Sequence, residues 1–138
     1  MQGRVLVPGE AAATSLKLSA PISFWGGIDP RTARVADPRH PEHDLSISGR
    51  VLVVPETVGS SSSSAILLEL LRLDIAPAAI VLGHSDAILV LGVLVGEELG
   101  YATIPVVELN RSDIADLPDG AEVSVGLEGT VSWSNQPA

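Results

Sequence analysis

The spacing of apolar residues changes about a third of the way along the chain. Before that point, RVLVPG from Arg4 and ATSLKL ending at Leu18 have the pattern of two short strands around the turn-forming Pro8-Gly9. Leu16 and Leu18 would share one face of the second strand, and we expect the two strands to lie antiparallel. Residues 21–48 have few periodic apolar positions but many Gly, Pro, Asp and His, which predicts a long ordered loop.

From residue 51 the pattern is typical of buried strands that alternate with helices. The runs VLVV at 51–54 and AAIVL at 78–82 are continuously apolar, as expected of strands covered on both faces. A helix is predicted over 63–73, a second one over 87–99 that ends at Gly100, and a third strand at 104–109. The first helix would bury one stripe, formed by Ile66, Leu67, Leu70 and Leu71. The pattern predicts a βαβαβ core.

The chain closes with a predicted hairpin, formed by 122–125 and 130–133 around Leu127-Glu128-Gly129. Together these elements favour an α/β fold, a mixed sheet or open barrel with helices packed on it. A length of 138 residues suits one core, so we expect residues 1–138 to form one domain. Because hydrophobic residues make up 46% and aromatic ones only 3%, that core has to consist of Val, Leu, Ile and Ala.

Charge and composition argue against several classes of function. Eight basic residues against 17 acidic ones give a net charge of −9, with no basic face suited to nucleic acid. Without cysteine, the chain itself can form neither disulfides nor thiolate ligands to zinc or an iron–sulfur cluster. The N-terminus has no signal-peptide pattern, and the longest apolar window, 87–96, is too short to cross a bilayer. We therefore expect a cytoplasmic protein that binds neither nucleic acid nor membrane.

Five serines, Ser60 to Ser64, connect the predicted strand at 51–54 to the predicted helix at 63–73. A serine-rich stretch is commonly a linker or a helix cap, but a linker does not normally join a buried strand directly to a buried helix. A helix N-terminus that follows a strand attracts anions, because its N–H groups are unpaired. Gly59 would turn the backbone with a positive φ and allow close approach to a ligand. We therefore predict a site loop in which Gly59, Ser61 and Ser62 bind substrate.

Other polar residues have both a functional and a structural interpretation. Asp37, His40, His43 and Asp44 carry side chains that suit zinc or iron, but a Pro-rich loop favours hydrogen bonds that fix the loop. Phe24 and Trp25 form either a local core or a docking surface. Either Ser85 or Asp86 would cap the second predicted helix. No metal site is predicted on this chain.

Four motifs together resemble the swivel domain of the aconitase X family. They are SFWGGIDP at 23–30, GRVLVVP at 49–55, GSS at 59–61 and APAAIV at 76–81. The resemblance runs from Gly3 to about Val107 and implies a swivelling β/β/α open barrel, as in the swivel domains of aconitase and isopropylmalate isomerase. It also implies a larger partner subunit that carries an iron or iron–sulfur centre, so no cofactor is expected on this chain.

The resemblance further implies a hydro-lyase that is active only with its large subunit. Its small-molecule substrate would be a hydroxy acid, either cis-3-hydroxy-L-proline or phosphomevalonate. Trp25 and the unbroken run of serines are more similar to the bacterial, hydroxyproline type. The alternatives are the small subunit of a phosphomevalonate dehydratase, a phosphohistidine carrier that uses His84, and a non-catalytic regulatory subunit.

In this resemblance, Ser60 takes the place of the alkoxide-type base of aconitase-like swivel domains. A serine hydroxyl is a weak acid, so its ionised form needs positive neighbours or the helix N-terminus. The family usually has Arg or Lys before the glycine, where this chain has Val58, so Arg50, Arg72 or an arginine of the partner would have to compensate. Ala33, where glycine is common, and Asp44 are further departures that we interpret as loop adjustments.

Overall fold

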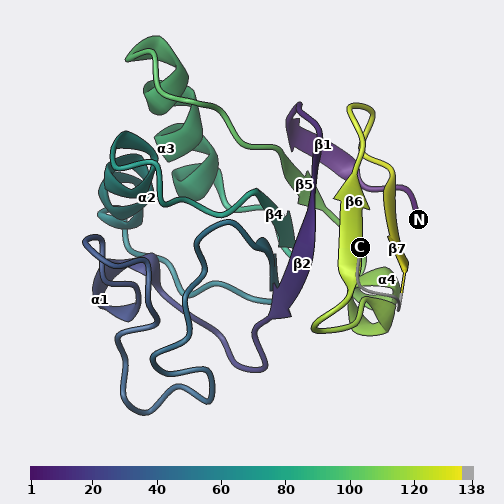
Figure 1. Cartoon of the computed structure of the whole chain (residues 1–138), viewed down its shortest axis with the longest axis horizontal. Coiled ribbons are helices and arrows are strands. Elements are labelled where there is room, and N and C mark those ends of the chain that lie inside the picture. The colour runs from purple at the N-terminus through teal and green to yellow at the C-terminus, as the bar shows by residue number, and fades with distance from the viewer. Residues whose placement is uncertain (135–138) are drawn as a thin grey trace.

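The computed structural model describes residues 1–134, so the end of the expected domain, residues 135–138, lies outside the description. The chain forms one mixed sheet with strand order β1-β5-β4-β3-β2-β6-β7 (Figure 1). The four strands β5, β4, β3 and β2 run parallel to one another. Strand β1 is antiparallel to β5, β6 to β2, and β7 to β6. In chain order the elements are β1 (Arg4–Val7), β2 (Ala11–Lys17), α1 (Phe24–Gly27), β3 (Val51–Val54), α2 (Ser63–Arg72), β4 (Ala79–Leu82), α3 (Ala87–Glu98), β5 (Val106–Glu108), α4 (Arg111–Asp116), β6 (Glu122–Val125) and β7 (Val131–Ser134).

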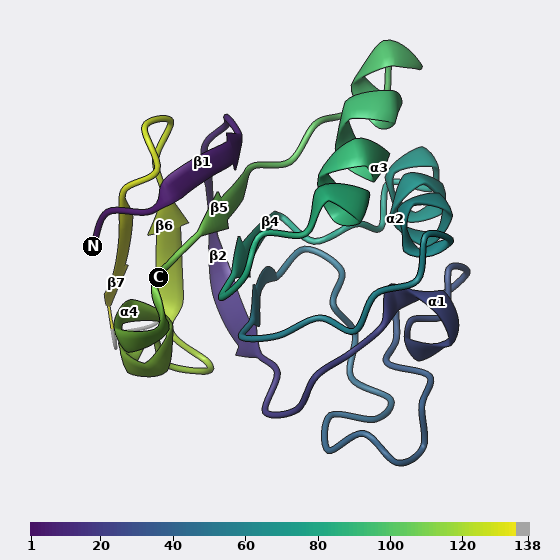
Figure 2. The ribbon, with the colours of Figure 1, turned by 180° about the vertical axis from the view of Figure 1, so that it is seen from behind.

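Strand β3 is buried on both faces, which explains why its sequence is apolar at every position. Leu52 and Val54 belong to a core shared with α2 and α3, whereas Val51 and Val53 belong to a second core shared with α4 and β6. The views from the front and from behind agree that α2 and α3 lie together on one side of the sheet, with α4 on the other (Figures 1 and 2). The predicted βαβαβ core and the α/β fold class are confirmed.

The sheet curls until its two ends meet at one corner. Gln2, just before β1, forms an antiparallel bridge with Thr130, and the backbone N–H of Val131 donates to the carbonyl of Met1 at 2.8 Å. The result is the curled half-barrel that the open-barrel prediction anticipated. Helix α4 was not predicted; it is capped by Asn110, whose side chain accepts a hydrogen bond from the backbone N–H of Asp113 at 2.8 Å.

The expected antiparallel pairing of the first two strands is wrong. Both edges of β2 are occupied, one by β3 and the other by β6, while β1 pairs with β5 at the far end of the sheet. The Pro8-Gly9 segment therefore carries the chain across the curled sheet instead of reversing it. Gly9 suits this crossing because a Cβ at that position would already lie 3.3 Å from Pro105.

The predicted long loop, residues 21–48, lies between β2 and β3; it is ordered and contributes to the core. Phe24, Ile28, Val35 and Ile47 are all at most 2% exposed. Isolated backbone bridges, such as the one between Ile28 and Val35, replace regular strands in holding the loop. This loop includes α1 and lies beside the N-terminal end of α2 (Figure 2).

Helices α2 and α3 pack closely because glycine lies between them. All four predicted stripe residues of α2 are buried, and a Cβ added at Gly92 of α3 would lie 2.8 Å from the carbonyl oxygen of Ser64. Gly100, with φ of 84°, ends the second helix as predicted. None of the helices within residues 1–134 is long and apolar enough to cross a membrane.

Gly83→Ala is expected to destabilise the protein by about 1–3 kcal/mol. A Cβ at Gly83, directly after β4, would overlap the carbonyl oxygen of Pro55 and lie 3.0 Å from its carbonyl carbon, forcing the ends of β3 and β4 apart. Gly59→Ala is the matched control, because a Cβ there would meet no atom within 4 Å. Urea unfolding of both variants measures the difference, and equal midpoints would contradict the importance of this close approach.

Candidate functional site

The serine loop leaves the carboxyl end of β3 and turns into the N-terminal end of α2. Before the serines, Thr57 forms a parallel bridge with Ile22, and the backbone N–H of Val58 donates to the carbonyl of Ile22 at 2.9 Å. The carbonyl of Ser60 then accepts from the backbone N–H of Ser63 at 3.0 Å. The loop is therefore attached to the long loop at one end and to the helix at the other.

Ser60 is half-buried at the entrance to α2. Its Oγ accepts a hydrogen bond from the backbone N–H of Ser62 at 3.3 Å. Ser62 is the N-cap residue of α2, but its side chain makes no capping hydrogen bond. The hydroxyl of Ser64 donates to the carbonyl of Ser61 at 3.0 Å. A capping role of the Ser62 side chain therefore does not account for the run of serines.

The predicted positive φ at Gly59 is wrong. Gly59 is absent from the left-handed region, which the glycines Gly26, Gly49, Gly100, Gly120 and Gly129 occupy. The turn into α2 is made instead by residues 61–62, before helix α2 begins at Ser63. What glycine provides at position 59 is open space, since a Cβ there would have no neighbour within 4 Å.

Ser63, which is not among the predicted site residues, makes the contact that joins this loop to α1. The residue is 4% exposed, and its Oγ accepts a hydrogen bond from the backbone N–H of Trp25 at 3.1 Å. Phe24 is 1% exposed and belongs to the core, whereas Trp25 is 58% exposed, and its role in docking a partner stays a prediction. The signal in the sequence was a polar residue on the buried face of an amphipathic helix.

A cleft of about 540 Å³ opens between the serine loop and the long loop. Ser60 itself does not line the cleft; Val58, two residues before it, does, and so does Trp25, which is bonded to Ser63. The lining residues are Pro21, Ile22, Ser23, Trp25, Gly26, Gly27, Ala36, Asp37, Pro38, Arg39, His40 and Val58. The cleft is therefore adjacent to the predicted catalytic loop and shares one wall with it.

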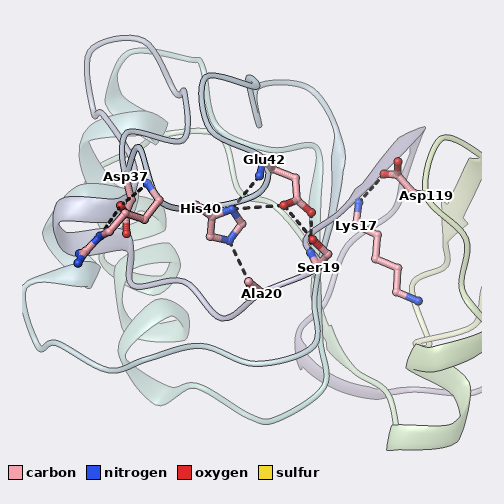
Figure 3. A network of polar contacts seen from close by, with 8 residues as sticks. Lys17, Ser19, Ala20, Asp37, His40, Glu42 and Asp119 are labelled. Atoms are coloured by element: carbon pink, nitrogen blue, oxygen red, sulfur yellow. Dashed lines mark hydrogen bonds and ion pairs between the residues drawn. The ribbon is translucent and has the colours of Figure 1, made fainter.

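A buried histidine network fixes the far wall of the cleft (Figure 3). His40 is 8% exposed; its Nε2 lies 3.1 Å from the carbonyl oxygen of Ala20, and its Nδ1 accepts from the backbone N–H of Glu42 at 3.1 Å. Both contacts fit the neutral tautomer with the proton on Nε2. The carboxylate of Glu42 in turn accepts from the backbone N–H of Ser19 at 2.6 Å and from its hydroxyl at 3.0 Å.

Asp37 and His40 therefore hold the loop by hydrogen bonds, as the structural interpretation predicted. Asp37 accepts a hydrogen bond from the backbone N–H of Arg39 at 2.9 Å. This bond, together with the contact of the Arg39 side chain, lowers the pKa of Asp37 from its usual value. The residues His43 and Asp44 are exposed, and the carboxylate of Asp44 pairs with Arg34 at 3.6 Å. Within residues 1–134, no group of three or more His, Asp or Glu side chains could hold a metal ion, so the side chains of this part do not fit an iron or iron–sulfur centre.

The two arginines expected to compensate for Val58 lie elsewhere. The guanidinium of Arg50, at the amino end of β3, donates to the carbonyls of Thr14 and Ser15 at 3.0 and 2.7 Å. Arg72 ends α2, whose axis is about 14 Å long, at the opposite end from the serines, and is paired with Glu69 at 2.6 Å. Neither cation is placed to stabilise a negative charge at Ser60.

The two loop departures are explained by backbone conformation. Ala33 and Asp44 both have left-handed backbone, with φ of 61° and 72°. Glycine adopts this region without steric cost, and Asp tolerates it better than Ala does. Ala33 is held there by complete burial and by a hydrogen bond of 2.8 Å from its N–H to the carbonyl of Asp29.

Between β4 and α3, Asp86 is the helix cap, which decides between the two predicted candidates. Its Oδ1 accepts from the backbone N–H groups of Ile88 and Leu89 at 2.9 and 3.1 Å. Its Oδ2 accepts from the hydroxyl of Thr57 at 2.8 Å, a contact that ties the start of the serine loop to α3. His84 is exposed, and its role as a phosphoryl acceptor stays a prediction.

Comparison with known proteins points to one family. The aconitase X swivel domain model matches residues 1–133. The chain is 45% identical over 103 residues to the cis-3-hydroxy-L-proline dehydratase of Pseudomonas aeruginosa. The aligned residues cover 75% of this chain but 18% of that protein. It is 36% identical over 126 residues to the phosphomevalonate dehydratase small subunit of Methanothermobacter thermautotrophicus, covering 91% and 92% of the two chains.

The fold agrees with these similarities. The crystal structure of Thermococcus kodakaraensis aconitase X in its holo-form superposes with a TM-score of 0.85 at 31% identity, over 96% of each chain. The chain spans only 18% and 22% of the length of the cis-3-hydroxy-L-proline dehydratases of Pseudomonas aeruginosa and Hypocrea jecorina that it matches. It corresponds to one part of those proteins.

Ser63→Ala is expected to destabilise the protein by about 1–2 kcal/mol and to shift the fluorescence of Trp25. The change removes the acceptor of the Trp25 backbone N–H and leaves that donor without its partner at the junction of the two loops. Ser64→Ala, one residue along, removes a hydroxyl whose hydrogen bond to the carbonyl of Ser61 is exposed to solvent, and should cost about 0.5 kcal/mol or less. Thermal unfolding together with fluorescence in a Trp133→Phe background tests this, and equal behaviour of the two variants would show that the Ser63 contact is dispensable.

Proposed function

Because the chain belongs to the aconitase X swivel domain family, we propose that it acts as the small subunit of a hydro-lyase that removes water from a hydroxy acid. The observation that carries this proposal is the match of the family model over residues 1–133. The position of the serine loop supports it, since the loop lies at the N-terminal end of α2 beside a cleft of about 540 Å³. A cleft of this size can admit a small-molecule substrate.

We assign the base of this reaction to Ser60. Elimination of water from a hydroxy acid requires a group that takes a proton next to a carboxylate. The N-terminal end of α2 carries a partial positive charge, which favours the ionised form of a serine placed there. Gly59, Ser61 and Ser62 would contact the substrate, and the open space at Gly59 leaves room for it. Because Ser60 does not line the cleft of the isolated chain, closure on the partner would complete the site.

The proposed substrate is cis-3-hydroxy-L-proline, with phosphomevalonate as the second candidate. The preference rests on Trp25 and on the serine run, and the identity of 45% to the Pseudomonas aeruginosa enzyme supports it. The near-complete coverage of an archaeal small subunit, 92% of its length, supports instead an arrangement in two chains. Both compounds carry a carboxylate, so the chemistry proposed for Ser60 is the same.

The proposed partner is an aconitase X-type large subunit, and we place the complex in the cytoplasm. Its metal centre, iron or iron–sulfur, would belong to the large subunit, since this chain has no cysteine. The exposed ring of Trp25 and the exposed side chain of Val58 offer apolar surface at the mouth of the cleft, where the large subunit would close. The name of the Methanothermobacter relative, a small subunit, supports this arrangement.

Ser60→Ala is expected to lower the turnover of the assembled enzyme by about 100- to 10,000-fold while leaving assembly unchanged. The reason is that the methyl group cannot accept the substrate proton. Ser85→Ala is the control, because Ser85 is an exposed serine that also lies on a loop between a strand and a helix N-terminus, that of α3. The measurement is steady-state dehydration by the chain copurified with its large subunit. Normal turnover by an assembled Ser60→Ala complex would exclude Ser60 as the base.

The substrate assignment is tested by offering both compounds to the same complex. We expect dehydration of cis-3-hydroxy-L-proline with a kcat/KM at least tenfold above that for phosphomevalonate, and no turnover by the chain alone. A reversed ratio would assign the second substrate. Turnover of neither compound by a stable complex would favour the non-catalytic regulatory subunit.

A further inference from the structure

The long loop contains the same three-residue turn twice. In Asp29-Pro30-Arg31 and again in Asp37-Pro38-Arg39, the aspartate Oδ1 accepts from the arginine backbone N–H at 2.9 Å. In both turns the arginine Nε lies 3.4 Å from the same oxygen. Both arginine side chains are largely exposed, 85% for Arg31 and 91% for Arg39. The two turns differ in location, since only the second one lines the cleft.

Arg39 is also the only Lys or Arg among the cleft-lining residues of the described part of the chain. All eight basic residues lie within it, and the other seven line no part of this cleft. Four of them are paired with carboxylates, Arg4 with Glu108, Arg31 with Asp29, Arg34 with Asp44 and Arg72 with Glu69. Arg50 and Lys17 donate to backbone carbonyls, and Arg111 lies in the first turn of α4.

The guanidinium of Arg39 is held from one side only. Its Nε–H donates to the carboxylate of Asp37, while the two terminal nitrogens have no partner among residues 1–134. A guanidinium uses these paired N–H groups to bind a carboxylate or phosphate in a bidentate manner. The backbone next to Arg39 is fixed, because the buried ring of the following residue, His40, contacts the backbone of Ala20 and of Glu42 (Figure 3).

We propose that Arg39 binds the anionic group of the substrate in this cleft. The inference rests on the proposed dehydratase function, which supplies a substrate with a carboxylate. In a chain with a net charge of −9, an anion needs a local cation to enter a cleft, and Arg39 provides it in the cleft that Trp25 and Val58 also line. Asp37 acts as a positioning residue that orients the guanidinium over the cleft.

The repeated turn supplies a matched pair of variants. In the complex with the large subunit, Arg39→Gln is expected to raise KM for the hydroxy acid about 10- to 100-fold with a smaller change in kcat, since it removes a charge-assisted hydrogen bond to the substrate. Arg31→Gln, which removes the same guanidinium–carboxylate contact from the turn that does not line the cleft, should leave KM within twofold. Arg39→Lys should recover part of the affinity, because it restores the charge without the bidentate geometry.

Two outcomes of the kinetic comparison overturn the assignment while leaving the dehydratase function intact. One is an unchanged KM in an active Arg39→Gln complex, and the other is an equal rise in the Arg31→Gln complex. If the wild-type complex dehydrates neither compound, the proposed function fails, and a titration of the chain with inorganic phosphate then decides about Arg39. We expect NMR shifts at the Trp25 indole and the Arg39 Nε–H that persist in Arg31→Gln and vanish in Arg39→Gln. Indole shifts that survive in Arg39→Gln, or no shifts in the wild type, overturn the proposal.

Discussion

The position of the serine loop depends on the close approach of Gly83 to the carbonyl of Pro55. This contact sets how near the ends of β3 and β4 can lie, because the backbone of one strand occupies the space that a side chain on the other would need. The loop begins at that point, and its next two attachments, Thr57 to Asp86 and Val58 to Ile22, follow within three residues. The segment that leads into α2 is thus held by contacts with the sheet, with the cap of α3 and with the long loop.

Local pattern was sufficient for the elements but not for their pairing. The continuous run VLVV predicted a strand covered on both faces, and the α2 stripe predicted its buried residues, because burial determines both patterns. The pairing of β1 with β5 could not be predicted, since a three-residue connection normally reverses a chain and the curl of the sheet is a property of all its strands. Helix α4 was missed because its six residues are too few to show a period.

In the candidate site, too, the features set by local sequence could be predicted and those set by long-range folding could not. The serine loop was found from its place between a strand and a helix, which is local information. The contact between Ser63 and Trp25, 38 residues apart, and the position of Arg39 on the cleft are consequences of how the long loop folds back. The expected compensation by Arg50 or Arg72 failed for the same reason. Both residues are near Ser60 in the sequence, but Arg50 lies at the amino end of β3 and Arg72 at the end of α2 away from the serines.

The left-handed backbone of Ala33 has a consequence for how the long loop opens. An alanine in this conformation costs about 1–2 kcal/mol relative to the right-handed region, so the segment around it opposes its own local preference. Its complete burial and its hydrogen bonds, from its own N–H to Asp29 and from the N–H of Ile47 to its carbonyl, hold it there. Because burial in the core holds this residue, we expect the amides of the segment to exchange together with the core that Phe24 and Ile47 share with α2.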